Sequence, residues 1–171
     1  MDTAVNDFVD KARQYCNLIQ HRQAHVSSWV FAHECLQSVL SLYRAGLALP
    51  EMEVEKSECM PDPIEHADWE VIRKSVAERL SRDLYWKIFE PLEKEPPEPV
   101  AGSITDDLAD IWRDVQMGLK LFGTATQKNK SAAVWHWRFS METHWGRHAV
   151  WAAWALTALC FGAYADETRP S

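Results

Sequence analysis

Residues 103–122 have the sequence SITDDLADIWRDVQMGLKLF, and this segment decides the fold class. Successive residues of an α-helix are about 100° apart, and at that spacing the apolar side chains fall on one stripe. Ser103 or Thr105 can cap the helix at its start. The stripe comprises Leu108, Ile111, Trp112, Val115, Leu119 and Phe122. The segment is therefore predicted to form an amphipathic helix that buries one face.

The same helical periodicity appears on both sides of this segment, whereas the alternation of β-strands is almost absent. Further helices are predicted at about residues 5–19, 28–49, 69–80 and 130–164, with a short additional helix at 83–89. The last helix contains Gly146, where we expect a close contact with another part of the backbone. The fold class is therefore all-α, and residues 1–171 are expected to form a single-domain bundle of about five helices with a long C-terminal helix.

Three segments lack helical periodicity. Residues 50–65 are acidic and contain two prolines, which indicates a surface loop, and residues 94–101 form a proline-rich, extended connector. The charged tail at 166–171 is expected to be frayed. The connector is long enough to carry the chain across the bundle but not long enough to establish a domain boundary.

Composition restricts the function. The net charge of −7 argues against binding to nucleic acid or to anionic lipid. No basic and apolar leader begins the sequence, so we expect a cytoplasmic protein with reduced cysteines. Cys16, Cys35 and Cys160 lie in apolar helical patterns and are predicted core residues, while Cys59 lies in the predicted loop and is the thiol expected to react.

The run from Ala149 to Ala165 contains no charged residue. A bilayer span needs about 20 apolar residues, and alanine gains little from lipid, so we do not expect this run to cross a membrane. A buried bundle helix explains the composition. The run also leaves open a homodimer, because its apolar residues occupy every side of the helix and a second copy could cover some of them.

Acidic residues form a second stripe beside the apolar face of residues 103–122. Asp107, Asp110 and Asp114 are three and four residues apart, so their carboxylates lie close together and repel one another. Carboxylates at the border of a buried face need cations or hydrogen-bond donors opposite them. The acidic stripe therefore predicts a complementary surface elsewhere in the bundle.

The helix predicted from residue 130 offers that surface. His144 and His148 are four residues apart and share a core-facing stripe, with Arg147 beside them and Arg138 further round the helix. No other segment carries so many cationic and donor groups on an apolar face. We therefore expect the two helices to pack side by side, with Asp110 near His144 and Arg147.

Two interpretations of this cluster remain open. In the first, the aspartates pair with Arg147, Arg113 or Arg138 and the histidines donate to carboxylates. Such a structural polar layer sets the register of the helices. In the second, a divalent metal is the cofactor, and His144, His148 and Asp110 are its ligands, as in metal sites built between facing helices of bundles. The H-x-x-x-H spacing is weakly specific, because it lacks the Glu of H-E-x-x-H and a paired Glu-x-x-His.

A third interpretation concerns two acidic pairs, Glu90-Pro91-Leu92-Glu93 and Asp107-Leu108-Ala109-Asp110. They are similar to the acids with which all-α nucleotide pyrophosphohydrolases hold Mg²⁺. Pro91 breaks the helix that such a pair needs, and the second pair has Asp where that class favours Glu.

The function that the sequence favours is a protein-interaction module that can self-associate. The alternative is a metal- or small-ligand-binding bundle. The second alternative is a Mg²⁺-dependent pyrophosphohydrolase.

Several distinctive blocks resemble one bacterial family, known as domain of unknown function 5063. They are YW at 85–86 with FEP at 89–91, GSITDDLADIWRD at 102–114, and WHWRFS at 135–140 with HWGRHA at 144–149. The pairs FV at 8–9, YC at 15–16, LY at 42–43 and LP at 49–50 fit as well. The resemblance covers most of the chain and implies a small cytoplasmic protein, but it implies no activity. His136 stands where the family pattern has an acid, which puts charge pairing around Arg138 in doubt.

Overall fold

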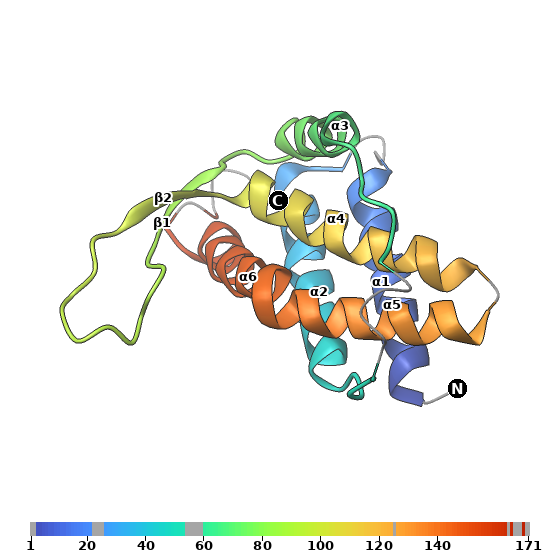
Figure 1. Cartoon of the computed structure of the whole chain (residues 1–171). Coiled ribbons are helices and arrows are strands. Elements are labelled where there is room, and N and C mark those ends of the chain that lie inside the picture. The colour runs from blue at the N-terminus through green and yellow to red at the C-terminus, as the bar shows by residue number, and fades with distance from the viewer. Residues whose placement is uncertain are drawn as a thin grey trace.

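The structure is a computed structural model, and it describes residues 3–21, 26–53, 60–124, 126–163, 165 and 169 (Figure 1). Its elements are helices α1 (Thr3–Gln20), α2 (Ser28–Leu47) and α3 (His66–Ala77), strands β1 (Leu84–Lys87) and β2 (Val100–Ser103), helices α4 (Ile104–Gly123) and α5 (Gln127–Ser140), the π-helix η1 (Met141–Trp145), and helix α6 (Gly146–Phe161). The predicted all-α bundle is confirmed. Within the described residues, α5, η1 and α6 follow one another without a break and form the long C-terminal helix.

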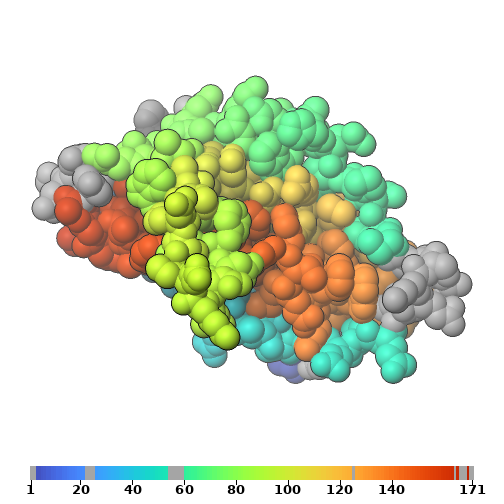
Figure 2. Space-filling view, turned by 60° about the vertical axis from the view of Figure 1, so that its left-hand side comes forward, coloured from blue at the N-terminus to red at the C-terminus, as the bar shows by residue number. Residues whose placement is uncertain are grey.

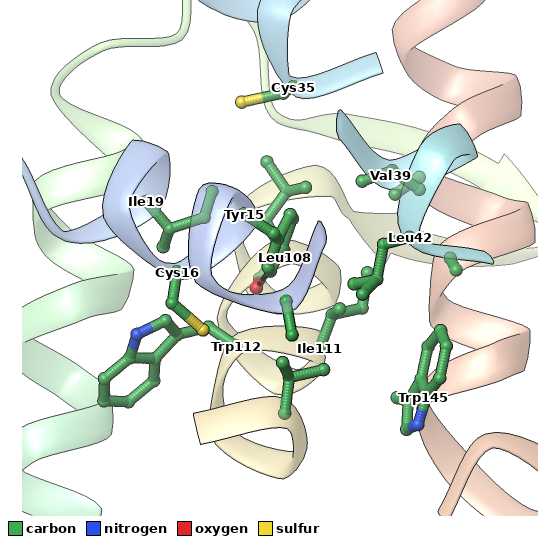
Figure 3. Close-up of a cluster of buried hydrophobic side chains, with 14 of the residues drawn as sticks. Tyr15, Cys16, Ile19, Cys35, Val39, Leu42, Leu108, Ile111, Trp112 and Trp145 are labelled. Atoms are coloured by element: carbon green, nitrogen blue, oxygen red, sulfur yellow. Dashed lines mark hydrogen bonds between the residues drawn. The ribbon is translucent and has the colours of Figure 1, made fainter. Parts of the chain in front are cut away.

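The core lies where α1 packs on the apolar stripe of α4, with α2 packed against α1 and α6. Figure 3 shows Tyr15 and Cys16 of α1 and Leu42 of α2 directed toward α4. The Tyr15 hydroxyl donates to the carbonyl of Leu108, with 2.7 Å between the two oxygens, and so satisfies the one polar group of a buried ring. The predicted stripe of α4 is buried except at Leu119, which is half-buried. The amphipathic pattern thus identified the face that packs on the core.

The short helix predicted at 83–89 is wrong, because residues 84–87 form strand β1, which pairs antiparallel with β2. The first residue of that predicted helix is Asp83, whose carboxylate accepts the Ser103 hydroxyl at 2.9 Å and the Thr105 backbone amide at 2.8 Å. Both groups lie at the start of α4. Because the Asp83 side chain is engaged there, it is not available to cap a helix at 83, and the aromatic residues that follow it pair as a strand.

The C-terminal helix differs from the prediction in one respect. Residues 141–145 form a π-helix, which adds a residue to the turn and widens it. Gly146 follows directly, and a Cβ atom there would lie 2.3 Å from the carbonyl oxygen of Met141. The expected close backbone contact at Gly146 is therefore present. Its partner is the carbonyl of Met141, five residues earlier in the same helical run.

None of the helices in the described part of the chain combines the length and the hydropathy that spanning a bilayer requires. The thiols of Cys16, Cys35 and Cys160 are free and buried, as predicted for core residues. Burial raises the pKa of the Cys16 and Cys35 thiols well above their usual value. Cys59, which we expected to react, lies outside the described residues.

Candidate metal centre

Helix α4 lies alongside α5 and α6 (Figure 1), and this packing brings two histidines to three aspartates. His144 comes from the π-helix and His148 from the first turn of α6, while Asp107, Asp110 and Asp114 follow one another along α4. The two imidazole rings lie next to each other, with centroids 4.7 Å apart. The acidic stripe and the histidine pair therefore face each other across one helix interface.

His144 contacts Asp114. The distance from its Nδ1 to the Asp114 Oδ2 is 2.8 Å, and the aspartate is mostly buried. The hydrogen bond to this carboxylate raises the pKa of His144 above its usual 6.5, although partial burial of the ring acts in the opposite direction. The carboxylate thus fixes the orientation of the ring and stabilises a proton on Nδ1.

His148 contacts Asp107 in the same way, with 2.7 Å between Nδ1 and Oδ1. The side chain of Asp107 is only 1% exposed, and two residues of strand β1 contact it as well. The Tyr85 hydroxyl donates to its second oxygen, and the Lys87 ammonium lies 3.7 Å from the first. Burial, followed by the hydrogen bond to Asp107, raises the pKa of Tyr85 well above its usual value, so the phenol remains a donor.

Asp110 lies between Asp107 and Asp114 along α4, and it does not contact a histidine Nδ1 as they do. One of its oxygens lies 2.8 Å from the Arg113 guanidinium, and the other lies 3.9 Å from Nε2 of His148. One ligand atom from each of Asp110, His144 and His148 lies within 4.8 Å of the others. These atoms are close enough to bind a single ion after small side-chain adjustments, because metal–nitrogen and metal–oxygen bonds of about 2 Å place ligand atoms roughly 3 Å apart.

The donor groups of this cluster are of the types that metal centres use. Metal-bound histidines almost always donate their other ring N–H to a carboxylate or carbonyl, which sets the tautomer and the direction of the free nitrogen. Here Asp107 and Asp114 occupy the Nδ1 positions, so Nε2 is the nitrogen of each ring left for a ligand. Imidazole and carboxylate together suit Zn²⁺, Fe²⁺ and Mn²⁺.

The two arginines that we placed near the aspartates lie elsewhere. The Arg138 guanidinium donates to the carbonyl of Leu49 and contacts the carboxylates of Glu51 and Glu142. Arg147 donates to the carbonyl of Thr143 at 3.3 Å and lines a pocket on another side of α6. Of the three arginines named as possible partners, the one beside Asp110 is Arg113, from its own helix, one turn further along.

His136 also joins this interface, although it is not part of the cluster. Its Nε2 lies 3.1 Å from the carbonyl oxygen of Asp114, and burial lowers the pKa of this histidine. It therefore remains neutral and can donate to the α4 backbone. The charge pairing that we questioned around Arg138 is satisfied by Glu51 and Glu142 instead.

Sequence reasoning missed Tyr85 and Lys87 as partners of Asp107. Both were assigned to a short helix, and the signal that could have corrected this is the sequence Leu-Tyr-Trp-Lys, whose aromatic residues favour strands. The acidic pair at Glu90 and Glu93 lies in an exposed turn rather than on a helix. These two carboxylates therefore lack the helical spacing on which the resemblance to a pyrophosphohydrolase depended.

The raised pKa of His144 leads to a prediction. Replacing Asp114 with asparagine should lower the His144 pKa to its usual 6.5 or below, since the acceptor that stabilises the imidazolium is removed. In the native protein the contact contributes stability that is complete below the unfolded-state pKa and is lost as the pH rises through the higher folded-state value. An NMR titration of the His144 ring in both proteins measures the shift; equal pKa values would contradict the assignment.

The fold and the site define an all-α bundle with a carboxylate-supported histidine pair between α4 and the C-terminal helical run. The chain belongs to the family described as domain of unknown function (DUF5063), whose model matches residues 1–161. Among solved structures, the crystal structure of protein BF1032 from Bacteroides fragilis is similar at 24% identity, with a TM-score of 0.78 over 92% of each chain. At that identity the similarity shows the fold alone. No curated protein matches the chain.

Proposed function

We propose that this protein binds a divalent transition-metal ion through His144, His148 and Asp110. The observation that carries the proposal is the pair of Nδ1 contacts, 2.8 Å to Asp114 and 2.7 Å to Asp107, which leave Nε2 of both imidazoles available to a ligand. A purely structural polar layer needs one hydrogen bond per ring. It does not require that a third carboxylate, that of Asp110, lies within 4.8 Å of a ring nitrogen of both histidines.

Such a site would be open. Structural zinc sites take four protein ligands, whereas three ligands leave at least one coordination position for water or a substrate. The side chains of His144, His148 and Asp110 are 37%, 17% and 16% exposed, so solvent reaches them. The geometry therefore favours a metal that activates water or binds a small molecule over a metal that only stabilises the fold.

Metal content tests the proposal directly. Protein loaded with Zn²⁺, Mn²⁺ or Fe²⁺ and then dialysed should hold close to one ion per chain by elemental analysis. His148→Ala and the double change His144→Ala with His148→Ala should reduce this at least tenfold, since two of three ligands are imidazoles. His21→Ala, which removes an exposed histidine of the same type, serves as the control.

Affinity should also depend on pH in a defined direction. The metal requires neutral imidazoles, and the pKa of His144 is raised, so the apparent affinity should increase as the pH rises through that value and fall below it. Isothermal titration at several pH values measures this together with the proton release. A native protein that binds none of the three metals at neutral pH, or a double histidine variant that binds as tightly as the native protein, would refute the proposal.

A second candidate function, a protein-interaction module that can self-associate, is favoured by a separate observation. Much of the uncharged run at 149–165 is buried inside the bundle, but Val150, Trp154 and Phe161 remain exposed. Trp154 is 61% exposed, and it borders a groove with Trp86 of strand β1, which is 69% exposed. Exposed aromatic residues grouped in this way are typical of interaction surfaces.

Sedimentation at micromolar concentration tests this second candidate. If the Trp154 surface forms a homodimer, the native chain should sediment with twice its 19.7 kDa mass and Trp154→Glu should be a monomer. Leu40→Glu is a suitable control because Leu40 is also exposed but lies on α2. A native chain that remains monomeric would exclude self-association through this surface.

A further inference from the structure

We propose that a pocket beside the candidate metal centre binds a small carboxylic acid with an apolar body, and that Arg147 holds the carboxylate. The pocket has a volume of about 540 Å³ and lies between the end of α2, the segment after β1, and the helical run from α5 to α6. Figure 2 shows the face on which these segments meet, with the yellow-green segment after β1 lying in front of the orange α6.

The apolar residues of the pocket indicate that the uncharged part of the ligand is apolar. Phe89 and Trp151 meet edge to face, with ring centroids 5.3 Å apart, and Tyr43 lies on the α2 side. Leu47 and Val150 also line the pocket, although both are exposed to solvent. Exposed apolar side chains that surround one hollow lose unfavourable contact with water when a ligand covers them.

Arg147 indicates that the other end of the ligand carries a negative charge. Among the residues that the structure describes, its guanidinium donates only to the Thr143 carbonyl, at 3.3 Å, and contacts no carboxylate. The other cation of the pocket, Arg138, is already neutralised by Glu142 at 3.2 Å and Glu51 at 3.1 Å. The planar guanidinium of an arginine with free donors can bind both oxygens of a carboxylate at once. Lysine, whose ammonium is a compact point charge, does not match this geometry as well.

The size of the pocket agrees with a small molecule. A volume of about 540 Å³ falls within the range of roughly 300–1,000 Å³ that is common for such ligands. Part of the wall is the π-helix, through Met141 and Glu142, and π-helical turns recur at functional sites. Met141 lines the pocket, while His144, from the same π-helix, contacts Asp114.

The pocket lies next to the candidate metal centre. Trp151 lines the pocket, and its ring also meets the His148 ring edge to face, with centroids 5.7 Å apart. A ligand beside Trp151 would therefore lie one side chain away from His148. The inference does not depend on a metal, and its test uses metal-free protein, so that it can fail or succeed independently of the proposed metal site.

Three probes with the same body separate charge from hydrophobicity: 4-phenylbutyrate, 4-phenylbutanol and 4-phenylbutylamine. Calorimetric titration should give the tightest binding for the carboxylate. Arg147→Gln should weaken it roughly tenfold or more, the size expected for a charge-assisted hydrogen bond, and should leave the alcohol unchanged. Arg13→Gln, at an exposed arginine on α1, is the matched control. The Trp151 indole resonance should move on binding, whereas that of Trp154 should not.

Three results would overturn the inference. The alcohol or the amine could bind as tightly as the carboxylate, which would exclude Arg147 as the recognition group. Arg147→Gln could bind the carboxylate as the native protein does. The third result is that all three probes fail to bind at millimolar concentration. That result would exclude this pocket as a site for such molecules.

Discussion

Replacing Asp107 with alanine should lower the free energy of unfolding by about 3–5 kcal/mol, the usual cost of removing one partner from a buried ion pair. The side chain is 1% exposed, and the Lys87 ammonium beside it is also buried, at 10% exposure. Without the carboxylate, the Lys87 charge, the Tyr85 hydroxyl and the His148 N–H all lose their acceptor. Urea denaturation at neutral pH measures the difference.

The control for this change is Asp10→Ala on the exposed side of α1, which should cost under about 0.5 kcal/mol. Adding Lys87→Met to Asp107→Ala should restore part of the lost stability, because methionine fills a similar volume without a charge. If Asp107→Ala is no more harmful than Asp10→Ala, the network between β1, α4 and α6 does not stabilise the protein as we describe.

Replacing Gly118 with alanine should destabilise the protein by roughly 1–3 kcal/mol or more, because the new methyl group would overpack the core. A Cβ atom at Gly118 would lie 2.1 Å from Nε1 of Trp137. That indole cannot easily move: it is fully buried, it donates to the Val115 carbonyl at 3.0 Å, and its ring contacts Phe8 and Phe122. The packing of α4 against α5 thus requires glycine at this position.

Gly123 at the end of the same helix provides the matched control. A Cβ atom there meets nothing within 4 Å. Gly123→Ala should therefore leave stability unchanged or increase it by up to about 1 kcal/mol, through the higher helix propensity of alanine. Thermal unfolding should show a lower melting temperature for Gly118→Ala and no decrease for Gly123→Ala. A neutral Gly118→Ala would show that α5 lies further from α4 than the structure places it.

The principal helices were predictable because their amphipathic patterns are local. The stripe at 103–122 identified both the helix and the face of α4 that is buried, and Ser103 caps it as expected, accepting the Asp106 amide at 3.1 Å. The strand at 84–87 was not predictable from periodicity. Its four residues are too few to show a pattern, and its partner begins more than ten residues later, so the pairing depends on the folded chain.

For the candidate site, the sequence identified the residue types and their helices but not their pairing. It placed Asp107, Asp110 and Asp114 on one stripe and His144 and His148 on another, because each set follows the repeat of a single helix. Which aspartate meets which histidine depends on how far one helix is displaced along the other. Packing sets that displacement, and the π-helix changes the angle between the two histidines as well.

The burial of Asp107 shows where local information ends. From the sequence, its place on α4 made it one of three equivalent acids, and Asp110 was the expected centre. Only the tertiary structure brings Tyr85 and Lys87 over it from β1, so that it becomes the most buried of the three. Helix periodicity determines which side chains share a face, whereas burial and partners depend on segments that are distant in the chain and meet only when the core has formed.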